Sequence, residues 1–252
     1  MKIFNFIKDF FATKKEDVYL ISFPKSGNTR FRMALAKYYQ LKYEVSSDLS
    51  YDWVNVILPA VGLGNIIDSR QKIKDLSKGQ KETLFIKSHL RYPVLKYFMK
   101  DNKVIYIQRP DVDTIMSFYD YSQARNIIRE NVTFSEFLRD PKYGISAFKK
   151  HLAQYNTITD NIVDYKELME NDIDVITKSL TKAKVQFDIS IMKKAIIETR
   201  RNNVVKINNK LDKDGYNFAA KRERHLNDYF TQKDVEYYNE VVQGSILKPI
   251  MV

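Results

Sequence analysis

A lysine, two hydroxyl residues and a glycine lie together at the end of an apolar stretch near the start of this chain. Residues 18–23 read Val-Tyr-Leu-Ile-Ser-Phe, and they are followed by Pro24-Lys25-Ser26-Gly27-Asn28-Thr29. The pattern predicts a buried strand, a tight turn and then a helix. Backbone N–H groups at a helix N-terminus carry partial positive charge, and glycine lets an anion approach the backbone closely. The stretch therefore predicts a binding site for a phosphate-like anion.

The order of lysine and glycine separates this turn from the loop of nucleoside triphosphate hydrolases. In that loop, GxxxxGK[ST], the lysine follows the last glycine, whereas Lys25 precedes Gly27. A nucleotide-dependent kinase of the P-loop class is therefore an alternative that requires different spacing. The simplest structural alternative is a plain strand-to-helix turn that happens to hold a lysine.

Two later apolar stretches also end in residues that bind anions or move protons. Residues 83–87 lead to His89, and residues 103–108 lead to Arg109. Short apolar runs that alternate with helical segments are typical of a mainly parallel sheet. Open parallel sheets bind ligands at the carboxyl ends of their strands, so we expect Lys25, His89 and Arg109 to lie at one edge.

The turn and the strand ends together resemble the sulfotransferases that use 3′-phosphoadenosine 5′-phosphosulfate (PAPS). The phosphosulfate loop of that family commonly reads Tyr/Phe-Pro-Lys-Ser/Thr-Gly-Thr/Asn-Thr-Trp, and residues 23–30 read Phe-Pro-Lys-Ser-Gly-Asn-Thr-Arg. Lys87-Ser88-His89 resembles the family's Lys-Thr-His strand end. The segment from Arg109 to Ser117 resembles its Arg-x-Pro-x-Asp…Ser segment, and Tyr165 lies in a stretch similar to its Tyr-Glu-Asp-Leu.

The resemblance implies a fold and an activity. The fold would be a single α/β domain over residues 1–252, with a mainly parallel central sheet flanked by helices, as in P-loop-like sulfotransferases. The activity would be in-line transfer of a sulfuryl group from PAPS to an acceptor hydroxyl or amine. The product of the donor would be 3′-phosphoadenosine 5′-phosphate (PAP), and no metal would be required.

The resemblance also implies site residues whose chemistry suits this transfer. An imidazole with a pKa near 6.5 can accept the acceptor's proton, so His89 is the expected base. Lys25 would neutralise the leaving phosphate, and Lys87, on the same strand face as His89, would steady the sulfuryl group. The residues expected to bind the nucleotide are Lys25, Ser26, Gly27, Asn28, Thr29, Arg30, Arg109, Ser117, Tyr165 and Arg222.

Each assignment has a simpler structural alternative. His89 could be a hydrogen-bonded histidine at a strand end, and Lys87 a solvated lysine at a sheet edge. Arg109 could pair with an aspartate of the following helix, and Ser117 could be a surface helix serine. Tyr165 is one of 17 tyrosines, so a chance match to one short segment is easy.

Two positions depart from the family pattern. Arg30 stands where the family commonly has a tryptophan that stacks on adenine, and a guanidinium can also stack on a base. The family's Arg-Lys-Gly-x-x-Gly-x-Trp segment has its nearest counterpart in Lys221-Arg222-Glu223-Arg224, without the glycines or the tryptophan. We take Arg222 as the candidate contact of the 3′-phosphate.

Composition limits the remaining classes of protein. The chain has 252 residues, 44% of them hydrophobic, and a formal net charge of +11, which favours anionic partners. It contains no cysteine, which excludes disulfides and thiolate sites, and its three histidines argue against a histidine-rich metal site. The absence of cysteine is compatible with a reducing cytosol, and together with the resemblance it leads us to expect a cytoplasmic enzyme. A basic module that binds nucleic acid or membrane is the alternative from another class, although no dense basic block or aromatic RNA motif is present.

The remaining expectations concern the N-terminus and the loops. Within residues 1–16, apolar residues recur at helical spacing (Ile3, Phe6, Ile7, Phe10 and Phe11), so we expect an amphipathic helix docked on the domain; an interfacial membrane helix is the alternative. Residues 43–80 and 202–229 predict substrate or nucleotide loops. We expect residues 43–80 and 120–150 to form the wall for a small-molecule, sugar or lipid acceptor, and we expect no nucleic-acid partner.

Overall fold

The centre of the fold is a four-stranded parallel sheet with the strand order β2-β1-β3-β4. The computed structural model describes residues 2–99, 101–200 and 224–251. The strands are β1 (Val18–Ser22), β2 (Phe85–Ser88), β3 (Lys103–Gln108) and β4 (Ile162–Asp164). Every residue of β1 is buried, as expected for a central strand covered on both faces. The predicted α/β fold with a mainly parallel sheet is confirmed.

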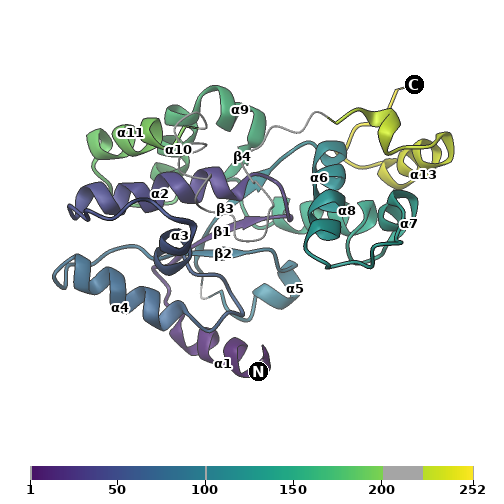
Figure 1. Ribbon diagram of the computed structural model, residues 1–252. Coiled ribbons are helices and arrows are strands. Elements are labelled where there is room, and N and C mark those ends of the chain that lie inside the picture. Colours follow the sequence, from purple (N-terminus) through teal and green to yellow (C-terminus); the bar gives the residue numbers. More distant parts are fainter. Residues whose placement is uncertain (1, 100, 201–223, 252) are drawn as a thin grey trace.

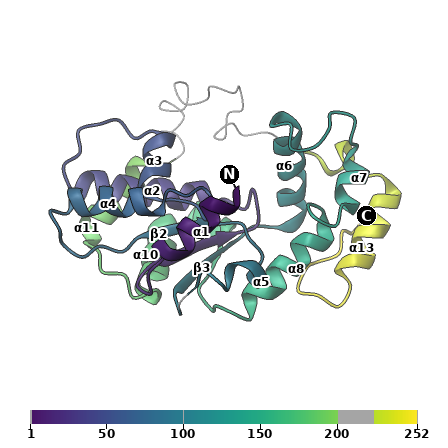
Figure 2. The same cartoon turned by 90° about the horizontal axis from the view of Figure 1, so that it is seen from below.

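Helices connect the strands and form two groups. Figures 1 and 2 show α2, α10 and α11 together on one side of the sheet, with α6, α7, α8 and α13 on the other. The helices are α1 (Lys2–Ala12), α2 (Asn28–Lys42), α3 (Tyr51–Ile57), α4 (Ile66–Leu76), α5 (Tyr92–Leu95), α6 (Asp111–Ala124), α7 (Phe134–Arg139), α8 (Ile145–Asn156), α9 (Tyr165–Glu170), α10 (Asp172–Lys182), α11 (Ile189–Glu198), the 3-10 turn η1 (Leu226–Asp228) and α13 (Gln232–Val242).

The strand register brings the predicted site residues to one edge of the sheet. Ile21 lies opposite Ser88 of β2, and Ser22 lies opposite Ile107 of β3. Gln108 in turn pairs with Asp164 of β4. All four strands therefore end at similar heights, and the residues that follow them emerge at the same carboxyl edge.

Local sequence signals explain several boundaries. Thr231 Oγ1 accepts a hydrogen bond from the Asp234 N–H, and the Asp234 carboxylate accepts one from the Thr231 N–H, so this capping box starts α13. Helix α5, between β2 and β3, is a single turn. Within the described ranges, no helix is both long enough and apolar enough to cross a bilayer.

Candidate active site

The turn after β1 has a backbone that favours glycine at one position. Gly27 is the N-cap of α2 and has a φ of 93°, and Lys25 has a φ of 68°. A Cβ atom added to Gly27 would lie 2.1 Å from Cδ2 of Tyr165. Glycine is thus required twice here, because the backbone is left-handed and because a tyrosine ring lies directly against it. Asn28 and Thr29 form the first turn of the helix.

Two donors near this turn are buried without a hydrogen-bond partner in the described part of the chain. They are the Ser26 hydroxyl and Nε of Arg109. Buried donors in native proteins nearly always have an acceptor, so this pair fits a ligand that presents oxygen atoms at the turn. The residues around the turn therefore fit an anionic group such as a phosphosulfate.

His89 follows β2 and is oriented by the end of β1. Its Nδ1 lies 2.7 Å from the Ser22 carbonyl oxygen, and a carbonyl can only accept. Nδ1 therefore carries the hydrogen and donates it, which leaves the lone pair on Nε2. Burial and the charge of Lys87 hold the pKa of His89 well below its usual value of 6.5. The imidazole is neutral near pH 7 and presents Nε2 as a proton acceptor.

Lys87 lies in β2, two residues before His89. Its backbone N–H donates to the Pro59 carbonyl oxygen over 2.7 Å, which attaches the segment after α3 to this strand. Burial, together with the charges of Arg32 and Lys25, lowers the pKa of the Lys87 ammonium to about 7. Lysine with such a pKa gains strongly from a nearby anion, because the anion stabilises its charged form.

Arg32 is a charged residue that our sequence analysis did not identify. Its side chain is buried, and Nη2 donates over 2.9 Å to both Oδ1 of Asn55 and the Leu58 carbonyl oxygen. One signal was available. Arg30 and Arg32 lie two positions apart in α2, about 200° around the helix axis, so they cannot both face the same way. One of them had to point toward the core or toward a site.

Arg109 occupies the opposite side of the turn, after β3. Its Nη1 lies 3.4 Å from the Lys25 carbonyl oxygen, and its guanidinium lies 5.0 Å from the ring centroid of Tyr165. It also forms an ion pair of 3.9 Å with Asp113. Arg109 thus joins the turn, the start of α9 and the start of α6. Arg109 therefore lies beside the turn, as expected for a site residue. It also pairs with an aspartate of the following helix, which was the structural alternative.

Helix α6 also contacts the turn. The Lys25 ammonium lies 4.7 Å from the ring centroid of Tyr121, a contact that our sequence analysis did not identify. Ser117 lies one helical turn before Tyr121, and it is buried. Residues four apart share a helix face, so Ser117 lies on the same face of α6 as Tyr121.

Arg30 is held by neighbouring helices. Its guanidinium donates to Asp172 over 2.5 Å, to the Ile196 carbonyl oxygen over 3.1 Å and to the Thr199 hydroxyl over 3.0 Å. Asp172 also pairs with Arg200 at 3.0 Å. The edge of the guanidinium is thus occupied by protein acceptors. Its contact with an adenine, which would use a face of the group, stays a prediction.

The C-terminal basic segment is described only in part. Arg222, the predicted contact of the 3′-phosphate, and its neighbour Lys221 lie outside the described residues. Arg224 is described, and its Nε donates to Asp120 of α6 over 2.8 Å. Tyr229 donates to the other oxygen of the same carboxylate over 2.9 Å. The chain after the basic segment is therefore attached to α6, the helix that also carries Ser117.

Solved structures with the same fold include ligand-bound sulfotransferases. Mouse sulfotransferase SULT7A1 complexed with PAP superimposes with a TM-score of 0.61 at 18% identity, covering 97% of this chain and 91% of that one. Retinol dehydratase in a complex with retinol and PAP has a TM-score of 0.58 at 15% identity, covering 96% of this chain and 87% of that one. At these identities the likeness concerns the fold.

Curated relatives match over shorter stretches. Sulfotransferase 4A1 from Homo sapiens is 26% identical over 186 residues, which cover 68% of this chain and 61% of that protein. Flavonol 4'-sulfotransferase from Flaveria chlorifolia is 28% identical over 144 residues, which cover 55% of this chain and 43% of that protein. The match thus spans about three fifths of the first relative's length.

The family model described as the sulfotransferase domain matches a much larger part of the chain, residues 15–248. That range contains all the strands, the turn at residues 24–29 and the strand-end residues His89 and Arg109. The predicted resemblance is therefore confirmed, and this chain belongs to the sulfotransferase domain family.

Proposed function

We propose that this protein transfers a sulfuryl group from PAPS to a hydroxyl, or an amine, of a small-molecule acceptor. One observation carries the proposal above the others. His89 donates Nδ1–H to the Ser22 carbonyl and so presents an unprotonated Nε2 beside Lys87, at the same sheet edge as the anion-binding turn. A base, a cation and an anion cradle are the three elements that sulfuryl transfer requires.

The residues that would hold the donor lie on both sides of β1. Lys25, Ser26 and the first amides of α2 would bind the phosphosulfate, and Arg109 with Ser117 would bind the 3′-phosphate. Tyr165 packs on Gly27 and would lie near the adenine. When bound, PAPS supplies the sulfuryl group and departs as PAP.

On the acceptor side, His89 performs the proton transfer. Nε2 would take the proton of the acceptor hydroxyl while a lone pair of the hydroxyl oxygen forms the bond to sulfur, and the electron pair of the O–H bond would stay on that oxygen. The bond from sulfur to the bridging phosphate oxygen would break, and its electron pair would leave with PAP. The Ser22 carbonyl oxygen stabilises the resulting imidazolium, because it accepts a hydrogen bond from Nδ1–H. Lys87 and Lys25 stabilise the negative charge that spreads over the transferred and leaving oxygens.

The class of acceptor rests on the relatives. Retinol is bound in one structural neighbour, and the name of one curated relative identifies a flavonol as its acceptor. We propose a small molecule, sugar or lipid with a hydroxyl group. The cysteine-free composition supports placing the enzyme in the cytoplasm.

A screen of hydroxyl- and amine-bearing compounds with PAPS tests the proposal, read by the mass gain of one sulfuryl group. We expect product with the wild type and none with Lys25→Ala, because Lys25 contacts the donor in both ground and transition states. Lys193 is an exposed lysine of α11, so the control variant Lys193→Ala should retain the wild-type rate. A thermal shift with ATP–Mg²⁺ but not with PAP would instead support the kinase alternative and would refute sulfuryl transfer.

A further inference from the structure

Helix α1 packs on the domain through Asp9 and Phe6 and leaves three large apolar side chains on its outer side. Asp9 is 1% exposed, whereas Phe4, Ile7 and Phe11 are 61%, 50% and 76% exposed. We call these three residues the α1 face. Large apolar side chains gathered on one exposed side of a helix are typical of an interaction surface, because water-facing helix sides are normally polar.

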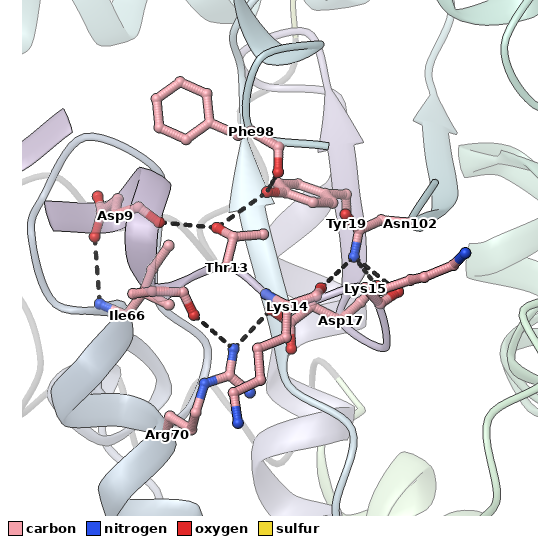
Figure 3. Close-up of polar contacts among 11 residues, drawn as sticks. Asp9, Thr13, Lys14, Lys15, Asp17, Tyr19, Ile66, Arg70, Phe98 and Asn102 are labelled. Atoms are coloured by element: carbon pink, nitrogen blue, oxygen red, sulfur yellow. Dashed lines mark hydrogen bonds and ion pairs between the residues drawn. The ribbon is translucent and has the colours of Figure 1, made fainter. Parts of the chain in front are cut away.

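Asp9 is responsible for this orientation. Its carboxylate accepts hydrogen bonds from the backbone N–H groups of Gly62, at 2.7 Å, and Gly64, at 3.0 Å. It also lies 3.4 Å from the N–H of Ile66, the contact drawn in Figure 3. A buried carboxylate with two or three such donors is costly to remove, so the helix cannot rotate to bury the α1 face.

The end of the helix is anchored as well. Arg70 of α4 donates to the Ala12 carbonyl oxygen over 3.0 Å and to Asp17 over 2.7 Å (Figure 3). Asn102 donates to the carbonyl oxygens of Lys14 and Lys15 over 2.6 Å and 3.1 Å. The α1 face is therefore held in a fixed position, on a helix that lies at the edge of the molecule in Figure 1.

Further apolar residues are exposed on the segments that α1 packs against. Leu63, between the two glycines that bind Asp9, is 61% exposed. Tyr97 is 66% exposed, and its neighbour Phe98 packs on the rings of Phe6 and Phe10 at centroid distances of 5.7 Å and 6.0 Å. Aromatic side chains of this kind settle at the boundary between lipid headgroups and acyl chains.

The charges around the α1 face match an anionic surface. Lys8 is exposed on the same side, with its ammonium 4.8 Å from the Phe4 ring centroid, and Lys14 is exposed just after the helix. Lys15 also follows the helix, and its ammonium lies 3.5 Å from a carboxylate oxygen of Asp101. Asp9, the acidic residue of the helix, points inward. A second copy of the chain is a poorer occupant, because a two-fold interface would bring the same lysines of two chains together. Each chain already carries a net charge of +11.

We propose that the α1 face binds the surface of an anionic lipid bilayer, with the helix lying in the interface and its lysines near the headgroups. The apolar side chains would enter the upper acyl region, and the lysines would neutralise lipid phosphates. The proposal rests on contacts of α1 alone, so it stands independently of the proposed sulfuryl transfer.

Co-sedimentation of the full chain with phosphatidylcholine vesicles, with and without phosphatidylglycerol, tests the proposal. We expect binding to the anionic vesicles, weakened but not abolished by salt, because both charge and apolar insertion contribute. The double variant Ile7→Ser/Phe11→Ser should lower the partition coefficient on the order of tenfold or more. Ile189→Ser/Ile246→Ser, which removes two exposed isoleucines elsewhere, should bind as the wild type does.

Both double variants should unfold at the same temperature as the wild type, because the side chains that they replace are exposed. Equal unfolding temperatures would show that the fold is retained. Wild-type failure to bind anionic vesicles, or equal binding by Ile7→Ser/Phe11→Ser, would overturn the proposal. So would light scattering that shows a dimer which this variant dissociates, because the α1 face would then bind a second copy.

Discussion

Positive charge is held differently on the two sides of β1. On the side of β2, Lys87 lies near Arg32 and Lys25, and burial with these cations lowers its pKa to about 7. On the side of β3 and β4, Arg109 pairs with Asp113 and Arg30 pairs with Asp172. We refer to these as the β2 side and the β4 side.

The difference separates the charge of Lys87, which has no carboxylate partner among these contacts, from that of Arg30, which is held by Asp172 within the protein. A buried ammonium among other cations is unfavourable, and an arriving anion relieves that cost, so the β2 side favours charge that develops in a transition state. An arginine that already has a carboxylate partner gains less from a ligand and contributes more to the folded state. We therefore expect substitutions on the β2 side to affect activity first, and Arg30 on the β4 side to affect stability first.

The largest effect should come from His89. His89→Asn keeps a side-chain donor for the Ser22 carbonyl but removes the base, so turnover of an acceptor found in the screen should fall about 10²–10⁴-fold. The dissociation constant of PAP, measured by titration calorimetry, should stay close to the wild-type value, because no role in nucleotide binding is assigned to this imidazole.

His89→Ala adds a control for the orienting hydrogen bond. It removes both the base and the donor to Ser22, so it should lose at least as much rate as His89→Asn. Turnover near the wild-type rate in either variant would show that His89 is a structural strand-end histidine. The β2 side would then lack its proton acceptor.

An intermediate effect should appear in the pH dependence of PAPS binding. The pKa of Lys87 is about 7 in the free protein, and a bound anion would raise it, so the charged form binds better. Affinity should be fully present below pH 7 and should weaken above it by up to about tenfold per pH unit. His89 adds no loss down to pH 6.5, because its pKa lies well below that value.

Lys87→Arg provides the matched control, since a guanidinium stays charged throughout this range. Titration calorimetry should show the decline above pH 7 in the wild type and a flat profile in the variant, even if the variant binds less tightly. A wild-type profile that is flat between pH 6.5 and 9 would show that Lys87 is charged throughout, like an ordinary surface lysine.

The positions of strand ends were predictable because they depend on short apolar runs. β3 has the predicted bounds, and the residues after β1, β2 and β3 do emerge at one edge. These features follow from burial of a central parallel sheet, which requires continuous apolar strands. The family pattern then identified Lys87 and His89 within that framework.

Partners distant in sequence were not predictable in the same way. The periodicity of α1 placed Phe6, Ile7, Phe10 and Phe11 on one face, but the bonds of Asp9 to Gly62 and Gly64 decide which side is buried. Those backbone donors have no signature in the sequence of the helix. The same holds for Arg32 and for the Asp172 partner of Arg30, whose contacts join residues 23 or more positions apart.

The smallest effect should come from Arg30, and it tests the β4 side. Arg30→Ala removes hydrogen bonds to Asp172, Ile196 and Thr199 and should lower the free energy of unfolding by about 1–3 kcal/mol, measured by urea denaturation. Lys37→Ala, which removes a more exposed ion pair of the same helix with Glu198, should cost at most about 1 kcal/mol. If Arg30→Ala weakens PAP binding and leaves the free energy of unfolding unchanged, Arg30 acts on the nucleotide. The ion pair with Asp172 would then not show that the charge of Arg30 serves stability alone.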